Sequence, residues 1–275
     1  MDNTSVETSD RPSSIESSSG ALVFSVVNQK GGVGKTTTAI NLSASLSQLG
    51  HRVLLVDLDP QANATSGVGL SHDQIRYSMY HVLMDPDLRD EVLCPTPFDN
   101  LHVMPSSRDL AGVEVELVHA VSRETVLRDR LLKYRQYYDF VLIDCPPSLS
   151  LLTVNALVAS DQAIIPLQCE YFALEGIAGL VQTLTQIRDH LNPRLEIGGI
   201  VLTMYDKRTS LNKQVVENAK RFFKHLVYDT VVPRTIRLTE APSHGVPISL
   251  YMPSSRGALA YEVLAKEVMS RVYSR

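Results

Sequence analysis

The chain has few cysteines, no long apolar stretch and no excess of basic residues. Its three cysteines lie far apart and form neither a disulfide framework nor the clustered spacing of a metal site. Their odd number indicates a reducing compartment. Each apolar stretch ends after about five to eight residues, whereas a membrane-spanning helix needs roughly 20. These absences argue against a disulfide-stabilised or transmembrane protein.

The first 20 residues also lack an apolar segment. They carry four acidic residues, one arginine and seven serines. A secretory signal needs a basic start and an apolar run, so this segment is not one. Its composition is typical of a solvated tail. We therefore expect a disordered tail at 1–20 and one folded domain at 21–275, since 44% of the chain is hydrophobic and can fill a core.

The net charge of −4 by itself disfavours a nucleic-acid partner. Its distribution is uneven, however. Basic and acidic residues number one and four in residues 1–20, 11 and 18 in 21–186, and 14 and eight in 187–275, giving −3, −7 and +6. Such asymmetry can mark a face that binds polyanions, although solvated helix faces give the same counts.

After residue 20, short apolar segments alternate with longer amphipathic ones. The predicted strands are Ala21–Val27, Arg52–Val56, Phe140–Ile143, Gln162–Leu167 and Ile197–Leu202. The predicted helices are Thr36–Leu49, Glu124–Tyr137, Leu174–His190, Asn212–His225 and Ser255–Tyr273. Nearly continuous runs of Val, Ile and Leu are typical of parallel strands buried on both faces. The pattern predicts an α/β fold with a doubly wound, mostly parallel sheet and helices on both faces.

A glycine-rich segment, NQKGGVGKTTT at Asn28–Thr38, links the first strand to the first helix. Glycines let backbone N–H groups turn toward phosphate oxygens, and the helix N-terminus favours negative charge. Gln29 replaces the first glycine of the common phosphate-loop pattern, but the context and the intact G-K-T ending still favour a phosphate loop. The expected phosphate contacts are Gly31, Gly32, Val33, Gly34, Lys35, Thr36 and Thr37.

Two side chains of this loop carry specific chemistry. Lys35 is expected to reach the β- and γ-phosphates, and the Thr36 hydroxyl to bind Mg²⁺. The base is expected to be adenine, because Thr203-Met204-Tyr205-Asp206 has the spacing of a guanine-reading motif but lacks its lysine. ATP and Mg²⁺ are therefore the predicted cofactors.

The segment from Lys30 to Thr36 resembles the deviant Walker A motif of the ParA/MinD group of P-loop ATPases. The resemblance implies a P-loop NTPase fold of the deviant Walker A type. It also implies an ATP-dependent homodimer that sandwiches two nucleotides. Lys30 would then be the signature lysine, which reaches the phosphates held by the other subunit.

Acidic residues close two of the predicted strands. Asp57 and Asp59 follow one strand, and Asp144 follows another. Carboxylates at the carboxyl ends of strands face the ligand crevice of an open α/β sheet. Asp144 is expected to hold Mg²⁺ through water, because Mg²⁺ usually keeps several of its waters. A strand-end aspartate can also simply cap the next element.

Five segments together look like the chromosomal ParA/Soj proteins, and the resemblance covers nearly all of residues 21–275. They are Asn28–Thr38, Val53–Thr65, Val141–Ser148, Gln168–Gly176 and Glu240–Gly245. The resemblance implies that Asp59 positions the attacking water, with Lys30 and Lys35 completing the catalytic set. It implies that Asp57 joins Thr36 and Asp144 around Mg²⁺, and that switch I and switch II follow Asp59 and Asp144. It places adenine near Met204, Pro233 and Arg234.

The same resemblance implies a function. The ATP-bound dimer would bind double-stranded DNA without sequence preference, and a ParB-type partner would accelerate slow hydrolysis to drive chromosome or plasmid segregation. The protein would be cytoplasmic and nucleoid-associated in its ATP state. DNA contacts are expected at Arg208 and Arg237, with further candidates at Lys207, Lys213 and Arg256, all within the basic third.

Two other functions are considered. A MinD-like membrane switch needs a strongly basic amphipathic C-terminal helix, but residues 255–275 carry a charge of only +2. A helix packed on the sheet is the better interpretation, so no membrane partner is expected. A metabolic or redox ATPase related to the nitrogenase iron protein would need a cluster bridged by two cysteines from each subunit. Cys94 and Cys145 do not match those positions.

Overall fold

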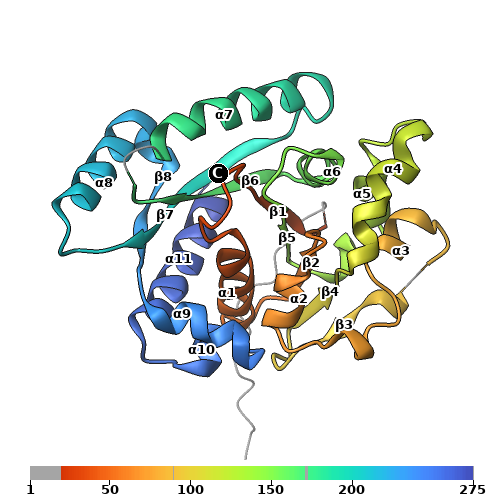
Figure 1. Ribbon diagram of the computed structural model, residues 1–275, viewed down its shortest axis with the longest axis horizontal. Helices are drawn as coiled ribbons and strands as arrows, with labels where there is room; N and C mark the ends of the chain where they lie inside the picture. Colours follow the sequence, from red (N-terminus) through yellow and green to blue (C-terminus); the bar gives the residue numbers. More distant parts are fainter. Residues whose placement is uncertain (1–19, 89, 171–172, 275) are drawn as a thin grey trace, which may run out of the picture.

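The computed structural model describes residues 20–88, 90–170 and 173–274 (Figure 1). Apart from Gly20, the tail expected at 1–20 lies outside the described residues, and so do Tyr171 and Phe172 of the segment that resembles ParA/Soj. In the part of the chain that is described, no helix is both long and apolar enough to cross a bilayer.

An eight-stranded sheet runs through the molecule in the order β3-β4-β2-β5-β1-β6-β7-β8. Its strands are β1 Leu22–Val26, β2 Val53–Asp57, β3 Cys94–Pro95, β4 Leu101–Met104, β5 Phe140–Asp144, β6 Gln162–Gln168, β7 Glu196–Tyr205 and β8 Val227–Pro233. Only the β3–β4 pair is antiparallel among these neighbours. The predicted doubly wound, mostly parallel α/β sheet is confirmed.

Helices cover both faces of the sheet (Figure 1). On one face lie α3 Met79–Met84, α5 Val126–Leu131, α6 Leu151–Ala159, α7 Ala173–His190 and α8 Ser210–Phe223. On the other lie α1 Lys35–Gln48, α2 Asn63–Gly67, α9 Ile236–Glu240, α10 Ile248–Tyr251 and α11 Arg256–Tyr273. A short α4 spans Val113–Glu116, and single 3₁₀ turns occur at His72–Gln74, Asp90–Val92, Arg108–Gly112, Leu117–His119, Arg135–Tyr137, Lys224–Leu226 and Ala241–His244.

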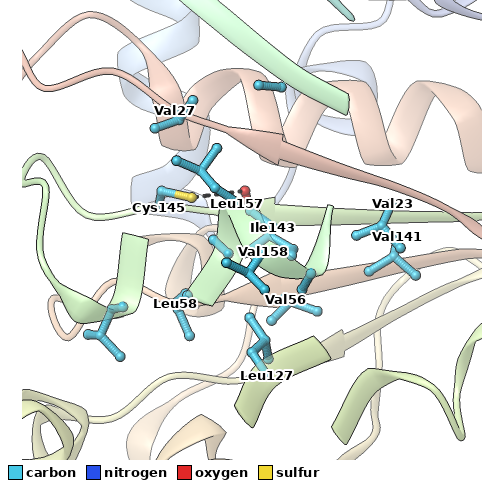
Figure 2. Packing of buried hydrophobic residues seen from close by; sticks show 14 of the residues in the cluster. Val23, Val27, Val56, Leu58, Leu127, Val141, Ile143, Cys145, Leu157 and Val158 are labelled. Carbon is cyan, nitrogen blue, oxygen red and sulfur yellow. Dashed lines mark hydrogen bonds between the residues drawn. The ribbon is translucent and has the colours of Figure 1, made fainter. Parts of the chain in front are cut away.

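Successive strand residues enter opposite cores. Val23 belongs to the core beneath α6 and Phe24 to the core beneath α1 and α11, as the period of two in a strand requires. Figure 2 shows the first of these cores, where Leu157 of α6 lies near strand residues such as Ile143. Each fully buried aliphatic side chain contributes about 1.5–3 kcal/mol through removal from water. The sheet is thus a stable platform for the loops at its carboxyl edge.

One predicted helix is much shorter than expected. The segment Glu124–Tyr137 contains α5 only at Val126–Leu131, followed by a turn and the 3₁₀ turn. The chain leaves the helix because Arg135 is needed at the start of β1. The Arg135 carbonyl accepts the Ala21 N–H at 2.7 Å, and its guanidinium pairs with Asp161 at 2.7 Å. A tertiary contact therefore overrides the local helical preference.

The parallel register places the functional loops at one edge. Asp57 of β2 lies opposite Asp144 of β5, and Val26 of β1 lies opposite Asp144 on its other side. The loop that follows β1 therefore begins beside Asp144, and Asp57 lies one strand further along the sheet. This is the crevice where open α/β sheets bind their ligands.

Candidate nucleotide site and basic face

The loop between β1 and α1 has the backbone shape of a phosphate cradle. Gly32 and Gly34 have φ values of 72° and 91°, in the left-handed region that side-chain-bearing residues rarely adopt. Gly34 is the N-cap of α1, and no side chain caps the helix there. The first N–H groups of α1 are therefore free to bind an anion at the positive end of the helix dipole.

Two side chains from outside the glycine run fix the loop. The Thr203 hydroxyl of β7 donates to the Val33 carbonyl at 2.8 Å. Asn28 donates to the Pro166 carbonyl of β6 at 2.7 Å and accepts the Lys30 N–H at 3.0 Å. Because Asn28 and Thr203 are both buried, these hydrogen bonds tie the loop to its neighbouring strands. These contacts set the shape of the phosphate loop.

The two lysines of the motif lie in opposite environments. Lys35 is buried, and its Nζ donates to the Lys30 carbonyl at 3.2 Å across the loop. Burial lowers the pKa of Lys35, and the nearby Asp144 counteracts this. The Lys30 side chain is 49% exposed, and its Nζ pairs with Glu170 at 3.0 Å. Lys35 thus serves its own loop, whereas Lys30 points away from it.

The acidic strand ends Asp57 and Asp144 are both fully buried, but their hydrogen bonding differs. Asp57 accepts the Asp59 N–H on Oδ1 and two donors from Thr65 on Oδ2. Neither oxygen of Asp144 has a hydrogen-bond partner among the described residues. Burial raises the pKa of Asp57 to about 6 and raises that of Asp144 well above its usual range, with further repulsion from Asp57.

The difference in hydrogen bonding between Asp57 and Asp144 indicates which of the two carboxylates is available to a metal ion. A buried carboxylate without donors is costly unless a cation or hydrogen bonds offset its desolvation. Asp144 meets that description, and the Thr36 hydroxyl and the charge of Lys35 both act to lower its pKa. The residues predicted to hold Mg²⁺ therefore fit it at Asp144 and Thr36. Asp57 lies beside them, but its oxygens already accept three hydrogen bonds.

Asp59 lies two residues beyond the end of β2 and is nearly buried. Its Oδ1 accepts the Gln61 N–H at 3.0 Å, which shapes the turn after the strand. Asp59 is close enough to Lys35 to act on its pKa, and it also acts on that of Asp144. The structure therefore brings Lys35, Asp59 and Asp144 together at one edge of the sheet.

The residues predicted near adenine also converge. Pro233 of β8 pairs with Tyr205 of β7, and the Arg234 N–H donates to the Tyr205 carbonyl at 2.9 Å. Met204 precedes Tyr205 and has a φ of 54°. Such a conformation costs a non-glycine residue of order 1–3 kcal/mol and is found preferentially at functional sites. Contact with a base at this position stays a prediction.

The five residues predicted to bind DNA are all exposed. Lys207 and Arg208 lie in the loop after β7, Lys213 in the first turn of α8, Arg237 in α9 and Arg256 at the start of α11. We call them the basic face. Because β7 and β8 are neighbours, the loops that follow them begin side by side. Arg256 joins them because Gly257 packs closely against Leu238 of α9.

The two leading arginines of the basic face are paired with carboxylates of the same chain. Arg208 contacts Asp206 at 2.6 Å, although its side chain is 84% exposed. Arg237 contacts Glu240 at 2.7 Å, and Glu240 also accepts a hydrogen bond from the Tyr251 hydroxyl at 3.3 Å. These pairs hold the pKa of Asp206 and of Glu240 below their usual ranges.

The sequence does not predict the individual roles of four residues that have structural roles at the site. Asn28, Thr65 and Glu170 lie within segments that carry the ParA/Soj resemblance. The sequences of these segments do not show what the three side chains contact. The motif that begins at Thr203 predicts only the choice of nucleotide base. In the structure the Thr203 hydroxyl also holds the phosphate loop through a hydrogen bond to Val33. Each acts across the fold, so no local pattern identifies its partner.

Comparison with known proteins shows which family the chain belongs to. A family model described as an AAA domain matches residues 21–197. The sporulation initiation inhibitor protein Soj of Bacillus subtilis is 52% identical over 246 residues, which is 90% of this chain and 97% of Soj. The chromosome partitioning protein ParA of Caulobacter vibrioides is 50% identical over 255 residues, covering 92% and 96% of the two chains.

The chain belongs to the ParA/Soj family of chromosome-partitioning ATPases. The resemblance that five segments indicate is confirmed over about 90% of the chain. A solved structure agrees with the fold. Cobyrinic acid a,c-diamide synthase from Mycobacterium smegmatis, with bound ADP and magnesium, has a TM-score of 0.81 and 35% identity, covering 92% of this chain and 96% of the other. The ParA/Soj chain is thus a P-loop ATPase.

Proposed function

We propose that this ATPase is a dimerisation switch that binds DNA in its ATP state and drives chromosome or plasmid segregation. ATP and Mg²⁺ bind at the phosphate loop, and two subunits close around two nucleotides. The closed dimer binds double-stranded DNA without sequence preference through the basic face. Hydrolysis, slow until a ParB-type partner stimulates it, opens the dimer and releases the DNA. The active pool is cytoplasmic and nucleoid-associated.

The observation that carries this proposal is the contrast between Lys35 and Lys30. A phosphate loop needs one buried lysine for its own nucleotide, and Lys35 fills that role. Lys30 is half-exposed, with its ammonium on Glu170 rather than in the cradle. A lysine so placed is available to a nucleotide held by a second subunit. The relative from Mycobacterium smegmatis, crystallised with ADP and magnesium, supports the same ligands here.

Mg²⁺ at Asp144 and Thr36 would neutralise charge on the phosphates when bound. The chain's own groups have separate tasks in this proposal. Lys35 and the backbone N–H groups of the loop bind the phosphates, and Asp59 orients the attacking water. Loss of the γ-phosphate removes the contacts that hold the two switches, so any ligand specific to the closed dimer is released.

A metabolic or redox role has weaker support. The solved relative from Mycobacterium smegmatis carries the name of a biosynthetic enzyme, but two relatives with about 50% identity are named for partitioning or sporulation control. Cys145 is buried in the core beside Leu157 (Figure 2), where burial raises the pKa of its thiol. That environment suits a packed thiol rather than a cluster ligand.

The test is a DNA-binding titration with ATP, with ADP and without nucleotide, over a range of salt concentrations. We expect tight binding only with ATP and a steep salt dependence, because each neutralised phosphate adds about −0.9 to the log–log slope. Lys30→Ala is the control and should remove the effect of ATP. DNA binding that is indifferent to nucleotide, or equal in the Lys30→Ala variant, would contradict the switch.

A further inference from the structure

The segment that carries Asp59 is attached to a single buried carboxylate at both ends. Asp57 Oδ1 accepts the Asp59 N–H at 3.2 Å. Asp57 Oδ2 accepts the Thr65 N–H at 2.7 Å and the Thr65 hydroxyl at 2.6 Å. The chain between residues 59 and 65 therefore forms a loop closed over Asp57. The short distance of the hydroxyl contact is typical of a charge-assisted hydrogen bond.

Thr65 also connects this loop to a third part of the chain. Its Oγ1 accepts the Ser106 N–H at 2.9 Å, from the segment after β4. Thr65, Ser106 and Asp57 are all buried. The Thr65 hydroxyl thus donates to one buried group and accepts from another, and water cannot replace either contact without entering the core.

The loop needs such attachment because its own secondary structure is weak. The helix that contains Thr65, α2, has only five residues. Its N-cap is Ala62, whose φ of 53° is unfavourable for a residue with a side chain, and no side chain caps the helix. Five residues are too few for a helix to persist without tertiary contacts. The Asp57–Thr65 contact is therefore one of the tertiary contacts that hold the segment carrying Asp59.

We propose that Thr65 is a positioning residue for ATP hydrolysis, whose hydroxyl holds the switch I loop and thereby aims Asp59. The inference rests on the role of Asp59 in the proposed function. It gives Asp57 the role of anchor for this loop, while Asp144 keeps its oxygens for the metal. The carboxylate, the hydroxyl and the Ser106 amide act as one unit.

The same hydrogen-bond pattern occurs on β8, where it is only partly buried. Glu267 of α11 accepts the Asp229 N–H on Oε1 at 2.7 Å. Its Oε2 accepts the Thr230 N–H at 3.0 Å and the Thr230 hydroxyl at 2.8 Å. Thr230→Val removes a hydroxyl–carboxylate bond of the same type from β8 without touching the phosphate-loop edge. It is therefore the control for a purely structural effect.

The experiment compares single-turnover ATP hydrolysis by the full chain and its Thr65→Val, Thr65→Ser and Thr230→Val variants, at varied ATP and Mg²⁺. For Thr65→Val we expect the hydrolysis rate to fall about 10- to 100-fold, because small displacements of a positioned group have effects of this size. The ATP and Mg²⁺ midpoints should change less than about twofold. Thr65→Ser should restore the rate, and Thr230→Val should lower only the melting temperature.

Several outcomes would overturn the inference. A normal rate in Thr65→Val would do so, as would an equal loss in Thr230→Val or a loss that Thr65→Ser fails to restore. If Thr65→Val does not fold, Thr65→Cys takes its place, and its weak S–H donor should give an intermediate rate. Asp59→Ala separates the two proposals. Normal hydrolysis by Asp59→Ala would remove the role of Asp59 itself, whereas a failure confined to Thr65 would leave that role standing.

Discussion

Two regions of the molecule differ in their charges: the phosphate-loop edge, which is the carboxyl edge of the sheet that carries the phosphate loop, Asp57 and Asp144, and the basic face. At the edge, Asp144 is a buried carboxyl group to which no donor of the described chain is hydrogen-bonded. On the face, Arg208 and Arg237 are exposed cations that already contact Asp206 and Glu240. The first region gathers buried carboxylates around Lys35, and the second has its positive charges partly neutralised. Under the proposed function, Asp144 would bind the metal directly or through water, whereas DNA would have to displace the carboxylates from Arg208 and Arg237.

The same contrast predicts effects of different size for substitutions in the two regions. Removing a charge from a buried site changes a strong interaction, because the surroundings cannot screen it. Exposed ion pairs are worth only about 0–1 kcal/mol, because water and salt screen them. We therefore expect substitutions at the edge to have much larger effects than substitutions on the face.

Asp144→Asn should have the largest effect. Without the carboxylate we expect ATP hydrolysis to fall at least about 100-fold and the Mg²⁺ midpoint to rise, as losses of metal-orienting groups do. The nucleotide-free variant should melt at a higher temperature, because burial without donors makes the charged Asp144 unfavourable.

Asp161→Asn provides the control for Asp144→Asn at the amino end of the strands. Asp161 accepts the Val23 N–H and contacts Arg135, so the loss of its charge should lower the melting temperature and leave the Mg²⁺ midpoint unchanged. Mg²⁺-dependent hydrolysis by Asp144→Asn at the normal rate would contradict the metal assignment and remove one half of the comparison.

Arg237→Glu should have the next largest effect, and it concerns DNA alone. We expect DNA affinity in the ATP state to fall more than tenfold and the log–log salt slope to become shallower by about 2, one lost phosphate contact in each subunit. ATP-dependent dimerisation, measured by sedimentation, should be unchanged. Loss of the dimer together with DNA binding would give Arg237 a structural role instead.

Glu240→Gln should have the smallest effect, and its sign is opposite. Freeing Arg237 from its carboxylate should raise DNA affinity about two- to tenfold, the range expected for one exposed ion pair in each subunit. Glu262→Gln is the matched control, because it removes the same charge from an exposed pair with Lys266 on α11. An equal gain in both variants would mean that net charge, rather than the Arg237–Glu240 pair, sets the affinity.

Some strands were predictable from the sequence because each is a nearly continuous apolar run. The strands β1, β2, β5, β6 and β7 follow predicted apolar runs. Others were missed for physical reasons. The sequence of α6, LLTVNALVA, is apolar on all sides, so its pattern does not distinguish a buried helix from a strand. In β8, Asp229 and Thr230 interrupt the apolar run, because they lie at the edge of the sheet.

The phosphate loop could be predicted from residue types alone, since Gly32, Gly34, Lys35 and Thr36 act within one short segment. The sequence also placed Asp57 and Asp144 at strand ends, but it could not tell them apart. The tertiary structure distinguishes them, because it places Thr65 on Asp57 and gives Asp144 no hydrogen-bond donor from the described residues. The reason is physical. A carboxylate's role depends on which groups share its burial, and those groups come from distant parts of the chain.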